Sequence, residues 1–145
     1  MPHTKHSAGA GRGFLTRLRS DVRGNTMLLV AGMFLPLVGF VGSGIDLSRA
    51  YMAKTRLQSA CDAAVLAARK TERGVGYTAA SEAVANQYFA ANYGANSFGS
   101  YDVDFSSART SDAKIEGVAS AKLDTGVMRV FGKDVFELEV ACKAA

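Results

Sequence analysis

The sequence is poor in the residues that build catalytic and metal sites. Of its 145 residues none is Trp, two are Cys and two are His. The histidines, His3 and His6, lie near the amino terminus, far from both cysteines. A nucleophilic site needs a histidine beside its Ser or Cys, and a zinc site needs several Cys or His close together. We therefore expect no catalytic residue, no cofactor and no metal ligand, and we do not expect the chain to be an enzyme.

Two other kinds of site lack their sequence pattern. No Gly-rich stretch has the spacing of a phosphate-binding loop between a strand and a helix. Asp102 and Asp104 alternate with apolar residues, and they lack the spacing of a calcium loop. Calcium binding by this pair is an alternative that the pattern does not favour.

Charged residues are absent from Asn25 to Ile45, and the chain is organised around this stretch. Ten of its residues are Leu, Ile, Val or Phe. A helix over it is about 30 Å long, the thickness of the hydrocarbon core of a bilayer. Pro36 and several glycines lie within it, but membrane helices tolerate both residue types. The stretch is predicted to be a transmembrane helix.

The excess positive charge of the chain lies before this stretch. Residues 1–24 contain five Lys or Arg and one Asp, whereas residues 46–145 contain twelve basic and twelve acidic residues. A basic flank marks the cytoplasmic side of a membrane helix. We therefore expect a cytoplasmic basic arm over 1–24, a single transmembrane helix over 25–45 and an outer domain over 46–145. The neutral remainder has no basic patch with interleaved aromatics, so nucleic acid is not an expected partner.

The helical pattern continues beyond the apolar stretch. From Asp46 to Arg73 the sequence has no Gly or Pro and is rich in Ala, which favours a helix. Apolar or small residues recur with the spacing of one buried stripe: Leu47, Ala50, Tyr51, Leu57, Cys61, Ala64, Val65 and Ala68. One helix of about 45 residues is predicted, half in lipid and half carrying the outer domain, with Gly74–Gly76 as its stop.

The remainder predicts a second helix and a small sheet. Thr78 can cap a helix that runs to about Tyr93. The apolar period then changes to two, with Tyr101, Val103 and Phe105 on one face of a strand. Two further strands are predicted over Lys114–Leu123 and Val135–Lys143, with a short helix over Thr125–Phe131 between them, closed by Gly132. The expected fold is α+β: a long N-terminal helix, a second helix and an antiparallel sheet of about three strands.

The two cysteines lie where a disulfide can form. Cys61 lies on the apolar stripe of the long helix, and Cys142 lies on the apolar face of the last strand. If that strand packs on that helix, the sulfur atoms approach each other in the core. In an oxidising compartment the bond would close a loop of about 80 residues and stabilise the fold by roughly 4–5 kcal/mol in the chain-entropy model. The alternative is a pair of buried, reduced thiols.

A pair of small residues lies within the apolar stretch. Gly39 and Ser43 are four positions apart, the small-xxx-small spacing that lets membrane helices pack closely. Self-association through this helix-packing face is one hypothesis. The other is that glycine is simply common in membrane helices.

Several short motifs resemble one protein family. Arg-Gly-Asn precedes the apolar stretch, and it is followed by Asp46, Arg49-Ala50-Tyr51, Arg56-Leu57-Gln58 and Asp62-Ala63-Ala64. Together they resemble the amino-terminal region of TadG-like (TadE/TadG-like) proteins of the bacterial Flp/Tad pilus-assembly system. The resemblance implies a pilin-like fold. It also implies a membrane-anchored component, similar to a minor pilin, that helps assemble adhesive pili. It places the span in the bacterial inner membrane and the outer domain in the periplasm. It implies other Flp/Tad pilus-assembly proteins as partners, with homo- or hetero-oligomers formed through the long helix.

The chain departs from this family pattern in two places. Longer relatives continue into a von Willebrand factor A-like domain with a metal-ion adhesion site, and this chain reaches Ala145 before one, so we do not expect that site. Related pilins are cut after a Gly and carry a Glu five residues later. Gly24 and Asn25 fit such a processing site, but Leu29 stands where the Glu is expected. We therefore expect the span to stay attached to its arm, with cleavage after Gly24 as the alternative.

A second function class is a secreted or periplasmic binding protein whose 25–45 stretch is a cleaved signal peptide. The basic arm fits the start of a signal peptide, and Val41-Gly42-Ser43 supplies small residues near a cut. Against this, the apolar run exceeds the usual length, and the helical pattern continues through the cut. The anchored protein is the favoured interpretation.

Overall fold

The computed structural model describes residues 22–72, 76–94 and 96–145. The chain divides into two compact units, Met1–Val38 and Gly39–Ala145. The helix α2 (Val22–Glu72) contributes turns to both units. The basic arm that the sequence predicts over residues 1–24 falls almost wholly outside the described residues.

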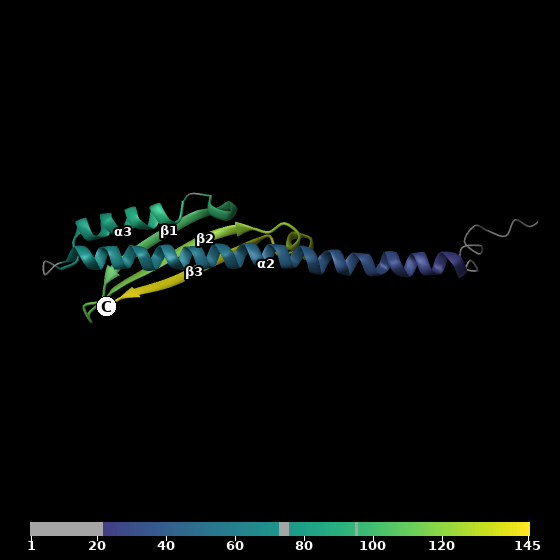
Figure 1. Cartoon of the computed structure of the whole chain (residues 1–145), viewed down its shortest axis with the longest axis horizontal. Coiled ribbons are helices and arrows are strands. Elements are labelled where there is room, and N and C mark those ends of the chain that lie inside the picture. The colour runs from purple at the N-terminus through teal and green to yellow at the C-terminus, as the bar shows by residue number, and fades with distance from the viewer. Residues whose placement is uncertain (1–21, 73–75, 95) are drawn as a thin grey trace, which may run out of the picture. The chain divides into compact units, whose positions relative to one another are not determined.

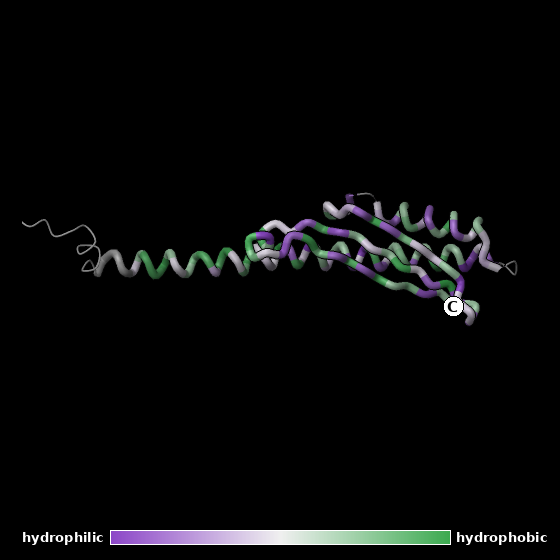
Figure 2. The backbone as a smooth tube through the Cα atoms, turned by 180° about the vertical axis from the view of Figure 1, so that it is seen from behind, coloured by the Kyte–Doolittle hydropathy of each residue, from purple (hydrophilic) through white to green (hydrophobic). Residues whose placement is uncertain are grey.

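The first turns of α2 are apolar and exposed. Pro36 lies inside the helix without ending it, since a proline removes only one backbone donor from a long helix. Figure 2 shows the hydrophobic colouring along these turns. The exposed large side chains of the first unit are Met27, Leu28, Leu29, Val30, Met33, Phe34, Leu35, Leu37 and Val38.

The second unit contains the rest of the α+β fold. After α2 the elements are α3 (Ala79–Asn92), the short helix η1 (Ser97–Gly99), β1 (Ser100–Arg109), β2 (Ile115–Asp124), the short helix η2 (Met128–Phe131) and β3 (Val135–Ala144). The three strands form one antiparallel sheet in the order β1-β2-β3. The predicted long helix, second helix and three-stranded sheet are therefore confirmed.

The helices α2 and α3 cover the same face of this sheet, as Figures 1 and 2 show from opposite sides. Phe89 of α3 stacks on Phe105 of β1 with ring centroids 4.5 Å apart. On β2 and β3 the buried residues alternate with exposed or half-buried ones. One sheet face is thus covered by helices and the other carries the polar side chains, the pattern of a two-layer α+β unit.

The stripe of α2 that packs on the sheet is built mainly from alanine. Its fully or almost fully buried members recur in steps of three and four: Ala50, Ala53, Leu57, Ala60, Ala64 and Ala68. The predicted stripe is right at Ala50 and from Leu57 to Ala68 but wrong at Leu47 and Tyr51, which are 61% and 73% exposed. Methyl side chains let the helix approach the sheet closely, so most of the buried face consists of small residues, with Leu57 and Val65 as its large members.

A bulge in β1 changes the face on which Tyr101 lies. Tyr101 pairs with Lys122, Phe105 pairs with Ala119, and the register shifts between the two pairs. The shift leaves one extra residue in β1 at the bulge, and Asp102 within the bulge has a φ of 48°. Since successive side chains of a strand alternate between faces, Tyr101 shares the open face with Lys122 while Phe105 faces the helices. The prediction that Tyr101 and Phe105 share one face is therefore wrong.

Candidate functional site

The buried stripe of α2 continues toward the amino terminus through three further positions. Asp46, Gly42 and Gly39 follow the same steps of three and four residues, and Asp46 is only 5% exposed. At these positions α2 is covered by residues 125–134, which we call the β2–β3 loop and which include η2. Figure 1 shows this loop beside α2. The contact joins a part of the helix that the sequence assigns to the membrane boundary with the connection between two strands.

Asp46 holds the β2–β3 loop through its side chain. Its Oδ1 accepts a hydrogen bond from the backbone N–H of Gly126 at 3.0 Å. Its Oδ2 accepts two more, from the N–H groups of Val127 at 2.8 Å and Met128 at 2.9 Å. These donors, with that of Met128 first, stabilise the charged form and lower the pKa of Asp46 below its ordinary value. One buried carboxylate thus satisfies three consecutive loop amides.

Two glycines allow the loop to lie directly on the helix. A methyl group at Gly42 would lie 2.4 Å from a Cγ atom of Val127, too close for any real contact. A methyl group at Gly39 would lie 3.0 Å from the ring of Phe131. By contrast, Gly32 and Gly44 have open space around them. Of these four helical glycines, Gly42 and Gly39 therefore have a packing reason for the missing side chain.

The helix-packing face proposed at Gly39 and Ser43 stays a prediction. Within the chain, Gly39 lies under the ring of Phe131, and Ser43 is half-buried. A second helix that packs closely on Gly39 would have to displace that ring. The sequence analysis did not predict the contact between the β2–β3 loop and α2. The available signal was the continuation of the three-and-four spacing from Ala50 back to Asp46, Gly42 and Gly39.

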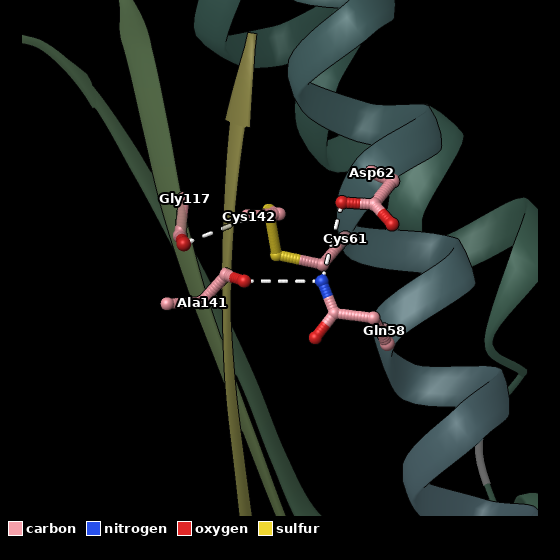
Figure 3. The surroundings of a disulfide bond; sticks show 6 residues. All are labelled: Gln58, Cys61, Asp62, Gly117, Ala141 and Cys142. Carbon is pink, nitrogen blue, oxygen red and sulfur yellow. Dashed lines mark hydrogen bonds between the residues drawn. A yellow bond between two sulfur atoms is a disulfide. The ribbon is translucent and has the colours of Figure 1, made fainter.

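The disulfide lies in the hydrophobic core of the second unit. The structure joins Cys61 of α2 to Cys142 of β3, with Cα atoms 5.8 Å apart. Figure 3 shows Gln58 beside this bond. Its side-chain amide donates to the carbonyl of Ala141 on β3 at 3.0 Å and to the carboxylate of Asp62 at 3.2 Å. Helix and strand are therefore held together by a covalent bond and an adjacent hydrogen bond.

The far end of the α2 stripe carries a second buried acid. Glu72 is 4% exposed and pairs with Arg69, one turn earlier, and with Arg109 of β1, whose Nη1 lies 3.5 Å from Oε1. A buried carboxylate needs such partners, since an unpaired one is costly. The stripe thus carries two paired carboxylates, Asp46 on backbone amides and Glu72 on arginines.

The remaining predicted site residues lie apart from this contact. Gly24 and Asn25 fall within α2, but their side chains are not described. Asp102 accepts from Lys122 at 3.1 Å on the exposed side of the sheet. Across residues 22–72, 76–94 and 96–145, no group of three or more His, Cys, Asp or Glu is arranged to hold a metal ion. The two histidines lie outside the described residues.

Comparison with known proteins identifies one family. Residues 24–85 match the model of the family described as Putative Flp pilus-assembly TadE/G-like. No curated protein and no solved structure matches the chain. In the described residues, α2 is the one helix long and apolar enough to cross a membrane, and a signal sequence would pass the same test. The resemblance read from the sequence motifs is thus confirmed over residues 24–85, where the chain is similar to the TadE/G-like family of Flp pilus assembly.

Proposed function

We propose that this protein is a membrane-anchored, minor-pilin-like structural component of Flp/Tad pilus assembly. The observation that carries the proposal is the change of environment along one helix. The first turns of α2 expose large apolar side chains on every side, whereas the turns from Ala50 to Ala68 bury a stripe against a folded domain. Apolar residues exposed all around a helix are expected where lipid surrounds it. The family match supplies the setting in pilus assembly.

The proposed topology places the basic arm (1–24) in the cytoplasm, the span (25–45) in the bacterial inner membrane and residues 46–145 in the periplasm. The arm carries a net charge of four positive units, which favours the cytoplasmic side. The Cys61–Cys142 bond supports an outer location of the domain, because disulfides persist in oxidising compartments. The span then fixes the distance of the domain from the membrane.

The packing of the β2–β3 loop on α2 supports a membrane anchor rather than a cleaved signal peptide. A cut near Ser43 would remove Gly39 and Gly42, on which Phe131 and Val127 pack. It would also leave the carboxylate of Asp46 within a few residues of a new, frayed helix end. A domain that uses these turns for its own packing is expected to keep them.

Partners are expected among the other Flp/Tad pilus-assembly proteins. Side chains on the uncovered side of α2 are available for lateral contacts, among them Leu47, Tyr51 and Leu66, which are 60–73% exposed. Homo- or hetero-oligomers through the long helix remain part of this proposal. A structural role of this kind needs no reacting group, and its mechanism is positional.

The proposal is tested by deleting the gene and counting surface pili by electron microscopy. Loss of pili, restored by the wild-type gene, is the expected result. Unchanged pili and unchanged surface attachment would overturn the role in assembly. Amino-terminal sequencing of the mature protein separates the anchor from the secreted alternative: a start at or before Asn25 supports the anchor, and a start near Gly44 contradicts it.

A further inference from the structure

We propose that the tip of the β2–β3 loop, formed by Val130 and Phe131, is a second membrane contact that inserts into the lipid beside α2. The inference rests on the proposed membrane span, and it adds a lipid-binding surface on the folded domain itself. The occupant is the outer part of the bilayer, where the headgroups meet the acyl chains.

The position of the loop along α2 sets its depth. Its residues contact three levels of the helix: Gly126 to Met128 meet Asp46, Val127 meets Gly42, and Phe131 meets Gly39. Asp46 lies seven positions after Gly39, which is about 10 Å along a helix axis. The loop therefore runs back along α2, from the first charged residue into the stretch that is predicted to lie in lipid. If Asp46 marks the membrane boundary, the ring of Phe131 lies well inside it.

The surface at this level is apolar on helix and loop alike. Val130 is 83% exposed and Phe131 is 67% exposed. On the adjoining turns of α2, Phe40 is 80% exposed, and Val41 and Ile45 are about 60% exposed. The exposed apolar side chains of the loop tip therefore adjoin apolar, exposed turns of α2 near Gly39. This continuity points to one occupant for both, the acyl chains that surround the span.

The polar groups of the loop are arranged for a place at the edge of a bilayer. Backbone N–H groups buried in lipid need partners within the protein. Those of 126–128 bond to Asp46, and those of Val130, Gly132 and Lys133 bond to carbonyl oxygens of the loop at 3.0–3.1 Å. The charged side chains of the loop, on Arg129, Lys133 and Asp134, are exposed, and long basic side chains can reach the headgroups from below them.

The test uses the full chain in phosphatidylcholine vesicles. Single cysteines replace Val130, Leu35 or Val118 and are labelled with an environment-sensitive fluorophore, while the native cysteines stay protected as the disulfide. Leu35 reports on the span, and Val118 is an exposed control on the open face of the sheet, 44% exposed. We expect a blue-shifted emission at Leu35 and Val130 but not at Val118. We also expect lipids with spin labels along the acyl chain to quench the probes at both Leu35 and Val130, with the Val130 probe quenched most by a label near the headgroup.

The other possible results overturn either the lipid contact of the loop or the membrane span itself. If Leu35 is quenched and Val130 behaves like Val118, the loop contact is wrong and the span stands. If Leu35 is not quenched, the span itself is wrong, and the loop contact falls with it. If quenching at Val130 falls as the protein becomes denser in the membrane, while quenching at Leu35 does not, the loop tip meets another protein and the lipid contact is wrong.

Discussion

The carboxylate of Asp46 accepts a 2.8 Å hydrogen bond from the backbone N–H of Val127, 81 positions later in the chain. Asp46 is the first charged residue after the apolar stretch, and Val127 lies in the loop between the last two strands. One side chain therefore connects the proposed exit from the membrane with the sheet.

Replacing this carboxylate tests how much the connection matters. In Asp46→Asn the amide group can accept at one oxygen only, and its N–H₂ faces loop N–H groups that also donate. We expect the melting temperature of the full chain in detergent to fall by several degrees and the loop to become sensitive to protease. Asp62→Asn is the matched control, because Asp62 is a half-buried acid of α2 that accepts a hydrogen bond from the side chain of Gln58 and not from a distant loop in the described residues. A control that melts as low as Asp46→Asn would contradict a special role for Asp46.

The same carboxylate gives a pH dependence of known sign. The backbone donors of Met128 and Gly126 lower the pKa of Asp46 in the folded protein below its ordinary value of 3.8. The stabilisation is therefore complete above that value and is lost as the pH falls through the lower, folded pKa. We expect the melting temperature of the wild type to approach that of Asp46→Asn as the pH falls below about 3.8. A constant difference between the two proteins from neutral pH down to strong acid would refute this assignment.

The glycines of α2 provide a second test of the loop contact. Gly42→Ala places a methyl group 2.4 Å from Val127, so the loop must move away. Overpacking of this kind costs about 1–3 kcal/mol in the free energy of unfolding. Gly44→Ala, two positions later and in open space, is expected to be neutral or slightly stabilising because alanine is the better helix former. Chemical denaturation in detergent measures both, and equal effects would argue against the contact.

Removing the disulfide tests the join between α2 and β3. Cys61→Ala combined with Cys142→Ala is expected to lower the free energy of unfolding by about 2–5 kcal/mol, since the closed loop is long. Reductant should destabilise the wild type by a similar amount and leave the double variant unchanged. Mass mapping under non-reducing conditions supplies the direct check. Two free thiols in the membrane-anchored protein would contradict the pairing.

The sequence predicts the elements well because each has a strong local signal. The missing charges between Asn25 and Ile45, the alanine-rich turns after Asp46 and the strict alternation in Val135–Ala144 each favour one type of structure. The pairing of Cys61 with Cys142 followed from the faces on which these elements place them. Local periodicity is therefore sufficient for the architecture of this chain.

Contacts between distant residues were harder to predict. The bulge beside Asp102 inserts one residue and moves Tyr101 to the open face, and nothing in the alternation of the sequence marks it. The burial of Asp46 depends on amides 80 positions away, which no local pattern of the sequence marks. Sequence motifs indicated that Asp46 belongs to a family pattern, but its role becomes clear only when the loop is seen on the helix.

The central claim is an anchored protein with its arm in the cytoplasm and its domain outside. Single cysteines at Ser7 in the arm and Ser111 in the exposed turn between β1 and β2 can be tested with a membrane-impermeant maleimide in spheroplasts. The account predicts labelling at Ser111→Cys in intact spheroplasts and at Ser7→Cys only after lysis, with both proteins in the membrane fraction. Labelling of Ser7→Cys without lysis, or a soluble protein that begins near Gly44, would contradict it.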